Sequence, residues 1–211
     1  MPRPCLDLSV YLVTDRPLSL GRDLADVVAA AVRGGATVVQ LREKHCSSRE
    51  MVELGRALKK VLEPTGVPLI IDDRVDVALA VGADGAHVGQ SDMHWRDARR
   101  ILGPDALLGL TIDHMHEVYE AEEADVDYLG VGPVFATKTH ENPAPVWGPE
   151  KLAEAVRASR HPVVAIGGVK SHNIKQVLAA KPAGVAVVSA ICSADDPESA
   201  ARDLLRKVQQ A

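Results

Sequence analysis

The sequence is poor in aromatic residues, which make up only 3% of its 211 positions. Any core that it buries must therefore consist mainly of Ala, Val, Leu and Ile. The hydrophobic fraction (46%) and the charged fraction (25%) are both ordinary for a globular protein. The length fits one domain with a sizeable core, so we expect residues 1–211 to form a single domain.

An excess of basic residues is also absent, since 24 Lys and Arg stand against 29 Asp and Glu, a net charge of −5. A general nucleic-acid binder usually shows a high pI or a basic patch. We therefore expect no nucleic-acid partner. A local basic pocket for a phosphorylated ligand remains compatible with this charge balance.

Cysteines and long apolar runs are scarce as well. Cys5, Cys46 and Cys192 are odd in number and widely spaced, which indicates free thiols in a reducing compartment. No apolar run approaches the roughly 20 residues that span a bilayer, and the first residues lack a signal-like apolar stretch. We expect a cytoplasmic protein without a membrane partner. Cys46 is close in sequence to the candidate site residues at 40–44. Its thiol could be reactive, but we favour the interpretation that it is incidental.

Short β-branched or aliphatic segments alternate evenly with amphipathic ones along the whole chain. The strand-like segments are 11–14, 37–41, 68–71, 85–88, 107–110, 128–131, 162–166 and 185–188, and the helical ones are 23–33, 49–62, 75–81, 94–102, 115–123, 150–158, 173–179 and 198–208. This pattern predicts an α/β protein with a single (β/α)8 TIM barrel. A doubly wound sheet is the alternative, but it usually has a glycine-rich turn after its first strand, where this chain has Thr14, Asp15, Arg16 and Pro17.

In such a barrel the active site lies at the carboxyl ends of the strands. After the second strand, Gln40, Arg42 and Lys44 occupy alternate positions and so share one face. An Arg fork and a Lys point charge pointing into the mouth predict a diphosphate clamp. The alternative is a solvated strand end.

Acidic residues follow the next two strands. Asp73 and Asp92 stand at neighbouring strand ends, where they could hold Mg²⁺ together with substrate phosphate oxygens. Alternatively, Asp72, Asp73 and Asp92 could simply cap the helices that follow them.

A second phosphate site is expected across the barrel. Gly167 and Gly168 end the seventh strand and allow a phosphate to approach backbone N–H groups, and the loops after strands seven and eight are the usual phosphate site of this fold. The long polar loop 136–148 carries Thr137, Lys138, Thr139 and His140, which could add hydroxyls and charge or could form an ordinary surface loop. Two phosphate sites and one metal site suggest two phosphorylated reactants, with diphosphate as the leaving group.

The motifs at these strand ends resemble those of the thiamine phosphate synthase family, in order and over nearly the whole chain. They are residues 40–44 (QLREK), 72–74 (DDR), 87–92 (HVGQSD), 130–135 (GVGPVF), 137–139 (TKT), 165–168 (AIGG) and 188–191 (VSAI).

The resemblance implies a transferase that condenses 4-amino-2-methyl-5-hydroxymethylpyrimidine diphosphate with 4-methyl-5-(2-phosphooxyethyl)thiazole, with Mg²⁺ as cofactor. Matched position by position, it implies a pyrimidine diphosphate site of Gln40, Leu41, Arg42, Glu43, Lys44, Asp72, Thr111 and His140, of which Arg42, Lys44, Thr111 and His140 are catalytic. It implies a thiazole phosphate site of Thr137, Lys138, Thr139, Gly168, Val188 and Ser189, and a metal pair of Asp73 and Asp92.

Three positions depart from the family pattern. Asp72 stands where Asn is commoner, and Thr111 stands where Ser is usual, although its hydroxyl can do the same work. His140 stands where the pattern has Lys, so a fixed charge is exchanged for a group with an ordinary pKa of about 6.5. Lys138 could substitute for it, or the loop could bind another ligand or support slower turnover.

Other functions fit parts of the pattern. The thiazole tautomerase relatives share the fold but lack the Gly-Gln-x-Asp element that this chain has at residues 89–92. A non-catalytic binding protein for thiamine precursors would fit the changes at Asp72 and His140. A sugar-phosphate isomerase would not need paired carboxylates beside a diphosphate clamp. Self-association into a homo-oligomer is left open by the sequence.

Overall fold

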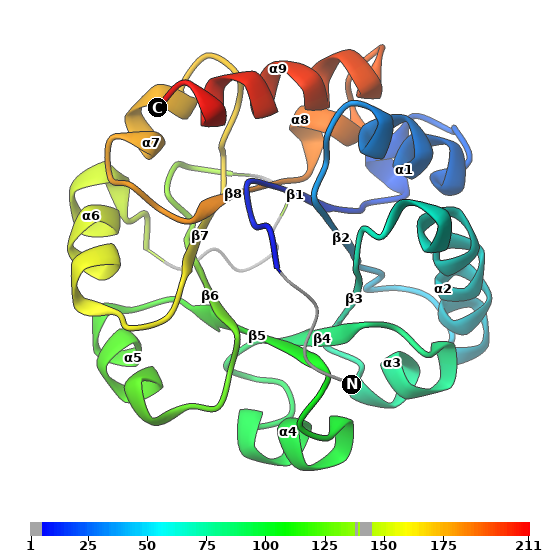
Figure 1. Ribbon diagram of the computed structural model, residues 1–211, viewed down its shortest axis with the longest axis horizontal. Helices are drawn as coiled ribbons and strands as arrows, with labels where there is room; N and C mark the ends of the chain where they lie inside the picture. The colour runs from blue at the N-terminus through cyan, green and yellow to red at the C-terminus, as the bar shows by residue number, and fades with distance from the viewer. Residues whose placement is uncertain (1–5, 138, 140–144) are drawn as a thin grey trace.

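The computed structural model describes residues 6–137, 139 and 145–211 (Figure 1). In this part of the chain, eight parallel strands close into a barrel in which each strand pairs with its neighbours in sequence and β8 pairs with β1. The strands are β1 Val10–Val13, β2 Val38–Leu41, β3 Leu69–Asp72, β4 Gly85–Val88, β5 Leu107–Ile112, β6 Tyr128–Val131, β7 Val163–Ile166 and β8 Gly184–Val187. The predicted TIM barrel is confirmed.

Helices surround the barrel and connect successive strands (Figure 1). They are α1 Leu24–Arg33, α2 Ser48–Leu62, α3 Val75–Val81, α4 Trp95–Leu102, α5 Met115–Glu120, α6 Gly148–Ala158, α7 Ile174–Leu178, α8 Ser189–Cys192 and α9 Pro197–Gln209, with 3₁₀ turns η1 Pro17–Ser19, η2 Glu63–Thr65 and η3 Ala121–Glu123. Ser47 and Glu50 form a reciprocal capping box at the start of α2. None of the helices in the described ranges is both long and apolar enough to cross a membrane.

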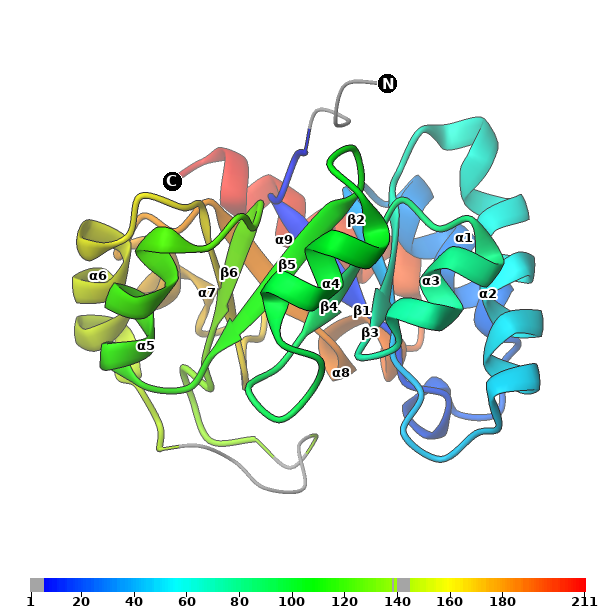
Figure 2. The ribbon, with the colours of Figure 1, turned by 90° about the horizontal axis from the view of Figure 1, so that it is seen from below.

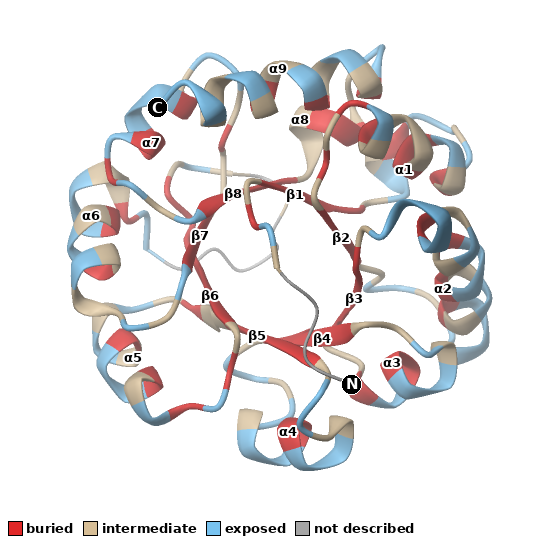
Figure 3. Ribbon diagram, in the orientation of Figure 1, coloured by how far each residue is buried: buried red, intermediate tan, exposed pale blue. Residues whose placement is uncertain are grey.

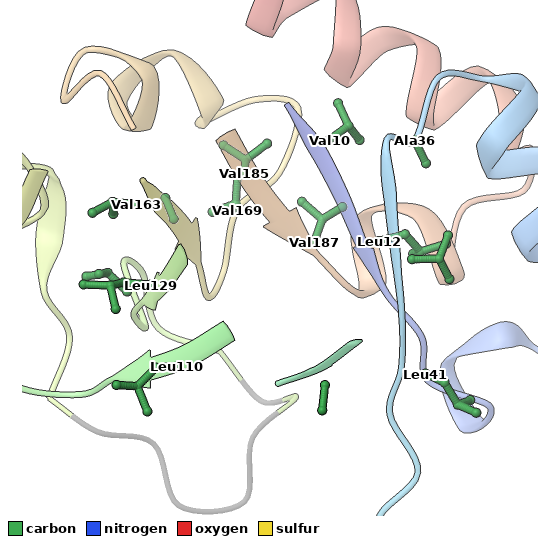
Figure 4. Close-up of a cluster of buried hydrophobic side chains, with 14 of the residues drawn as sticks. Val10, Leu12, Ala36, Leu41, Leu110, Leu129, Val163, Val169, Val185 and Val187 are labelled. Atoms are coloured by element: carbon green, nitrogen blue, oxygen red, sulfur yellow. The ribbon is translucent and has the colours of Figure 1, made fainter. Parts of the chain in front are cut away.

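The core has two layers, because alternate residues of each strand face opposite sides of the sheet. The larger layer packs the outer strand faces against the inner helix faces (Figure 3) and includes Leu12, Leu41 and Leu129 (Figure 4). The smaller layer fills the barrel interior, with Tyr11 and Tyr128 among its members. Every second strand residue is therefore directed into the barrel.

The register brings several polar inward positions together near the carboxyl ends of the strands. Gln40 pairs with Ile70, Asp72 with His87, and Thr111 with Gly130. Strand β5 runs two residues beyond the predicted segment 107–110, so Thr111 lies within the strand. Helix α8 lies at the end of the barrel opposite the N-terminal residues 6–9 (Figure 2).

Candidate active site

A compact cluster of charges occupies the barrel mouth beside β1, β2 and β3. Arg42 follows β2 directly, and its guanidinium lies 3.7 Å from Asp15 Oδ2 and 3.8 Å from Asp72 Oδ2. Lys44 Nζ lies 3.5 Å from Asp72 Oδ2 and makes a short contact with Asp73. The structure therefore brings together Arg42 and Lys44, the two cations predicted from their alternate positions.

Burial sets the electrostatics of this cluster. Asp72 is only 8% exposed, and burial and the neighbouring Asp73 raise its pKa to about 7 even though Lys44 and Arg42 act in the opposite direction. Burial lowers the pKa of Lys44, but Asp72 and Asp73 outweigh it and leave that pKa raised. Lys44 thus stays charged, and both basic side chains can exchange carboxylate partners for the oxygens of an anionic ligand.

Asp73 and Asp92 meet between the ends of β3 and β4. Asp92 accepts a hydrogen bond from the Gly89 N–H at 2.8 Å and lies in contact with Asp73. Burial raises the pKa of Asp92, the Gly89 bond opposes this rise, and the contact with Asp73 adds to it. Asp73 adopts a left-handed backbone conformation (φ 60°), which is uncommon for a residue with a side chain but tolerated best by Asp and Asn among such residues.

Neither carboxylate caps a helix. The N-cap of α4 is His94, whose ring accepts from the Arg96 N–H, and the N-cap of α3 is Arg74, which makes no side-chain cap. The capping alternative for Asp73 and Asp92 is therefore wrong.

The donor set fits a Mg²⁺ ion. Two like charges meet at Asp73 and Asp92, and a divalent cation would relieve the repulsion that contributes to the raised pKa of Asp92. In the described ranges no group of three or more His, Cys, Asp and Glu is placed to hold a metal ion. A metal here would depend on substrate phosphate oxygens and water, which is how proteins usually hold Mg²⁺.

A polar layer lies directly beneath the charged mouth. Gln40 Nε2 donates to the Tyr11 hydroxyl at 2.9 Å, and His87 Nε2 lies 2.8 Å from the Thr111 hydroxyl oxygen. Burial lowers the pKa of His87 to about 4, so its ring is neutral. Tyr11, His87 and Tyr128 were not predicted as site residues, although polar side chains at alternate positions of apolar strands are the signal that could have found them.

The glycine pair after β7 is required by close backbone packing. Gly167 and Gly168 both have positive φ (95° and 67°). The Phe135 N–H donates to the Gly167 carbonyl at 3.0 Å, and a Cβ on Gly168 would collide with Phe135 and Ala136. Phe135 and Ala136, at the start of the loop after β6, therefore pack against the carboxyl end of β7, close to the predicted phosphate site.

Lys170, which was not predicted, supplies the charge at this end. Its Nζ donates to the Ser189 hydroxyl at 2.6 Å, and no carboxylate pairs with it in the part of the chain that the structure describes. Burial lowers its pKa. Asn173 fixes the loop by accepting from the Lys170 N–H and donating to the Gly168 carbonyl. Lys170 lies in a loop without periodicity, so no strand or helix pattern indicated it.

The remaining predicted residues divide into three groups. Thr137 and Thr139 are described, and the Thr139 N–H donates to the Thr137 hydroxyl at 3.2 Å. Val188 packs against the inner core layer. Lys138 and His140 lie outside the described residues.

Two residues implied for the pyrimidine diphosphate site have side chains that do not face the mouth freely. The side chain of Leu41 is fully buried in the outer core layer, on the face opposite Gln40, so it cannot reach a ligand in the mouth (Figure 4). Glu43 pairs with Arg16 at 2.8 Å, and its side chain is only 6% exposed. Only backbone contacts with a diphosphate are open to these two residues.

Cys46 is not set up as a nucleophile. Burial raises the pKa of its thiol, and the charge of Glu43 raises it further, so the thiolate is disfavoured. This supports the interpretation that Cys46 is incidental.

A cavity of about 570 Å³ lies outside the barrel. Residues of α4 and α5 line it, including Trp95 and Tyr119, and it borders the mouth at Gly89 and Gln90. It contains neither the cationic pair nor the Asp73–Asp92 pair, so we place the chemistry in the mouth and not in this groove.

Comparisons with known proteins place the chain in one family. Residues 10–191 match the family model described as thiamine monophosphate synthase. A thiamine-phosphate synthase of Albidiferax ferrireducens is 52% identical over 90% of this chain and 87% of its own length, and one of Xanthobacter autotrophicus is 49% identical over the full length of both.

Solved structures extend the comparison. A thiamine phosphate pyrophosphorylase from Pyrococcus furiosus superposes with a TM-score of 0.89 at 38% identity and covers 97% of each chain. A 3-hexulose-6-phosphate synthase, at 17% identity and a TM-score of 0.69, shares the fold alone. The chain therefore belongs to the thiamine monophosphate synthase family and is an enzyme of the transferase class.

Proposed function

We propose that this chain joins 4-amino-2-methyl-5-hydroxymethylpyrimidine diphosphate to 4-methyl-5-(2-phosphooxyethyl)thiazole, forming thiamine phosphate and diphosphate. One observation carries the proposal. Two cationic groups share one barrel mouth, Arg42 and Lys44 beside β2 and β3, and Lys170 beside β7 and β8. Two separate anions can therefore bind side by side on the same face.

The first group is suited to the pyrimidine diphosphate. Arg42 and Lys44 are held in place by Asp15, Asp72 and Asp73, so their charges are already oriented before a ligand binds. Beneath them, Gln40 and Thr111 offer an amide and a hydroxyl to a heterocyclic ring. The diphosphate then lies over the cations and the ring points into the barrel.

Asp73 and Asp92 are the residues that would hold Mg²⁺. When bound, this ion would neutralise negative charge on the diphosphate as it leaves. Asp72 stays with the cations, because its carboxylate contacts both Arg42 and Lys44.

The second group is suited to the thiazole phosphate. Lys170 supplies a positive charge without a carboxylate partner in the described ranges, and Ser189 supplies a hydroxyl that already bonds to it. Gly168 belongs to this site as well, since Phe135 and Ala136 pack where its Cβ would be and so bring the loop after β6 to the end of β7. Thr137 and Thr139 lie on the loop that packs over this glycine.

The reaction is a dissociative substitution at the exocyclic carbon of the pyrimidine. The carbon–oxygen bond breaks, its electron pair leaves with the diphosphate, and the amino group of the ring stabilises the resulting cation. The thiazole nitrogen then donates its lone pair and forms the carbon–nitrogen bond. Arg42 and Lys44 stabilise the departing charge, and the barrel orients both rings, so no side chain needs to act as a nucleophile.

The direct test is incubation with both substrates and detection of thiamine phosphate and diphosphate. We expect product only when both substrates and Mg²⁺ are present, and none after chelation with EDTA. Omission of either substrate is the matched control. The proposed function is wrong if no condition gives thiamine phosphate.

A further inference from the structure

A chain of hydrogen bonds crosses the barrel interior from β2 to β5, beneath the mouth. It begins at Gln40, whose amide donates to Tyr11, and the hydroxyl oxygens of Tyr11 and Tyr128 are 2.6 Å apart. The Tyr128 hydroxyl lies 3.1 Å from His87 Nδ1, and His87 Nε2 reaches Thr111. The two end residues belong to the proposed pyrimidine site, whereas the three middle residues have no role in it.

The chain has a direction, because each member can donate only certain protons. The amide nitrogen of Gln40 has no acceptor capacity, so Tyr11 accepts there and donates its own proton to Tyr128. Tyr128 then donates to His87 Nδ1, which leaves the single N–H of a neutral imidazole on Nε2. His87 donates to the Thr111 oxygen, and the Thr111 proton is free to point into the mouth.

Every hydrogen bond of this chain could be satisfied in one other way, in which all donors and acceptors are reversed together. A partial reversal would leave a proton without an acceptor. If His87 carried its proton on Nδ1 while Gln40 kept its present orientation, Tyr11 would accept two bonds and its own proton would have no acceptor in the described interior. Tyr11 is 1% exposed, so bulk solvent does not reach that hydroxyl, and an unpaired buried proton is costly. The amide of Gln40 and the hydroxyl of Thr111 are therefore coupled across the barrel.

We propose that Tyr11, Tyr128 and His87 are positioning residues that fix the mouth with a hydrogen-bond acceptor at Gln40 Oε1 and a donor at the Thr111 hydroxyl. This arrangement recognises a flat heterocycle with an exocyclic amino group, which donates to Gln40, and an acceptor atom that faces Thr111. The inference rests on the proposed function. It goes further by naming the interior residues through which the barrel would select a substrate with an amino group.

The packing of the barrel interior holds the rings of this hydrogen-bonded chain in place. The rings of Tyr11 and Tyr128 have centroids 5.7 Å apart, and those of His87 and Tyr128 are 5.5 Å apart. Gly109, on the strand between β4 and β6, leaves the space that these rings occupy, because a Cβ there would collide with both His87 and Tyr128. The absence of a side chain at this position of β5 thus makes room for the hydrogen-bonded rings of His87 and Tyr128.

The tautomer of His87 is the first measurement. In wild-type protein labelled with ¹⁵N-histidine, the two ring nitrogens have distinct chemical shifts, and we expect the neutral form with its proton on Nε2. A neutral ring protonated on Nδ1, or a doubly protonated ring at pH 7.5, would overturn the inference. This measurement requires no substitution and no substrate.

Ligand selection is the second measurement. Calorimetry in Mg²⁺ would compare the pyrimidine diphosphate with the same compound lacking its amino group. Wild-type protein should prefer the amino compound by about tenfold or more, the effect of one good hydrogen bond, and Tyr128→Phe should lose most of this ratio. Tyr11→Phe is the second variant if Tyr128→Phe does not fold, and Tyr119→Phe, at an exposed helix position, is the control.

The outcomes separate the two claims. Wild-type protein that forms thiamine phosphate, together with a Tyr128→Phe variant that folds and keeps the full preference for the amino compound, would reject the positioning role alone. Wild-type protein that neither binds the diphosphate nor forms product would reject the proposed function and this inference with it.

Discussion

Asp72 is the residue at which burial and charge conflict most clearly. It is 8% exposed, lies between Arg42 and Lys44, and still has a pKa raised to about 7. The resemblance of the sequence motifs implies Asn as the commoner residue at this position. A carboxyl whose pKa is raised on folding binds its proton more tightly in the folded state, so folding is favoured at low pH and loses that contribution as the pH rises through the folded value.

Asp72→Asn should therefore stabilise the metal-free protein at pH 8. Asp72 is neutral in the folded and in the unfolded protein only well below its ordinary pKa of 3.8, where the two forms should be equally stable, and the difference should grow as the pH rises from 3.8 to about 7. We expect a gain on the order of 2 kcal/mol at pH 8, measured by urea unfolding in EDTA. A wild-type protein that is the more stable form at pH 8 would contradict the assigned pKa.

Asp92→Asn should remove Mg²⁺-dependent turnover. The substitution keeps size and shape but removes one of two carboxylates available to the ion, so Mg²⁺ affinity in the presence of the pyrimidine diphosphate should fall about tenfold or more. Asp97→Asn, on the exposed face of α4, is the matched control. Unchanged Mg²⁺ dependence in Asp92→Asn would show that the ion binds elsewhere.

Residue-level prediction from the sequence succeeded where strand alternation fixes direction. Arg42 and Lys44 were predicted to point together because they are two positions apart, and the structure brings them into one cluster. The same rule shows why Leu41, between them, faces the outer core. Lys170 could not be found in this way, because a loop has no period and its contact with Ser189 joins two different strand ends.

At the scale of elements, Arg99 holds α4 to the amino-terminal face of the barrel. Its guanidinium, buried to all but 10%, donates to the carbonyls of Gly103, Ala106 and Asp125 and to the Asp127 carboxylate. The Arg99 side chain thus connects the end of α4 to the segments that lead into β5 and β6. This end of a barrel contributes stability rather than chemistry.

Arg99→Met should destabilise the fold by about 3 kcal/mol, because it removes a buried charge together with the hydrogen bonds that Arg99 donates to three carbonyls and to the Asp127 carboxylate. The neighbouring Arg100→Met is the control, since Arg100 is 76% exposed and should change stability by less than about 0.5 kcal/mol. Thermal unfolding measures both. Turnover by folded Arg99→Met at 25 °C should match wild type, and a selective loss of kcat would place Arg99 in the chemistry instead.

The elements themselves were largely predictable. The eight strand segments agree with the structure to within one or two residues, because short β-branched runs between amphipathic stretches have few other solutions. Helix α8 was not predicted, since four residues are too few to show a helical period. The extension of β5 depends on pairing of Thr111 and Ile112 with β6, which is tertiary information.

At the scale of the whole molecule, closure of the barrel is what creates the site. Strands β2 to β4 and strands β7 and β8 are far apart in sequence, but the closed ring places their carboxyl ends around one mouth. Each part of the ring supplies its own cation and its own hydrogen-bond donors. We therefore expect two independent anion sites within one active site.

The most direct test measures both KM values in two variants. Lys170→Met should raise KM for the thiazole phosphate roughly 10- to 100-fold and leave KM for the pyrimidine diphosphate within about twofold. Arg42→Met should do the reverse, with a fall in kcat as well. If both substitutions weakened binding of the same substrate, the two-site account of this barrel mouth would be wrong.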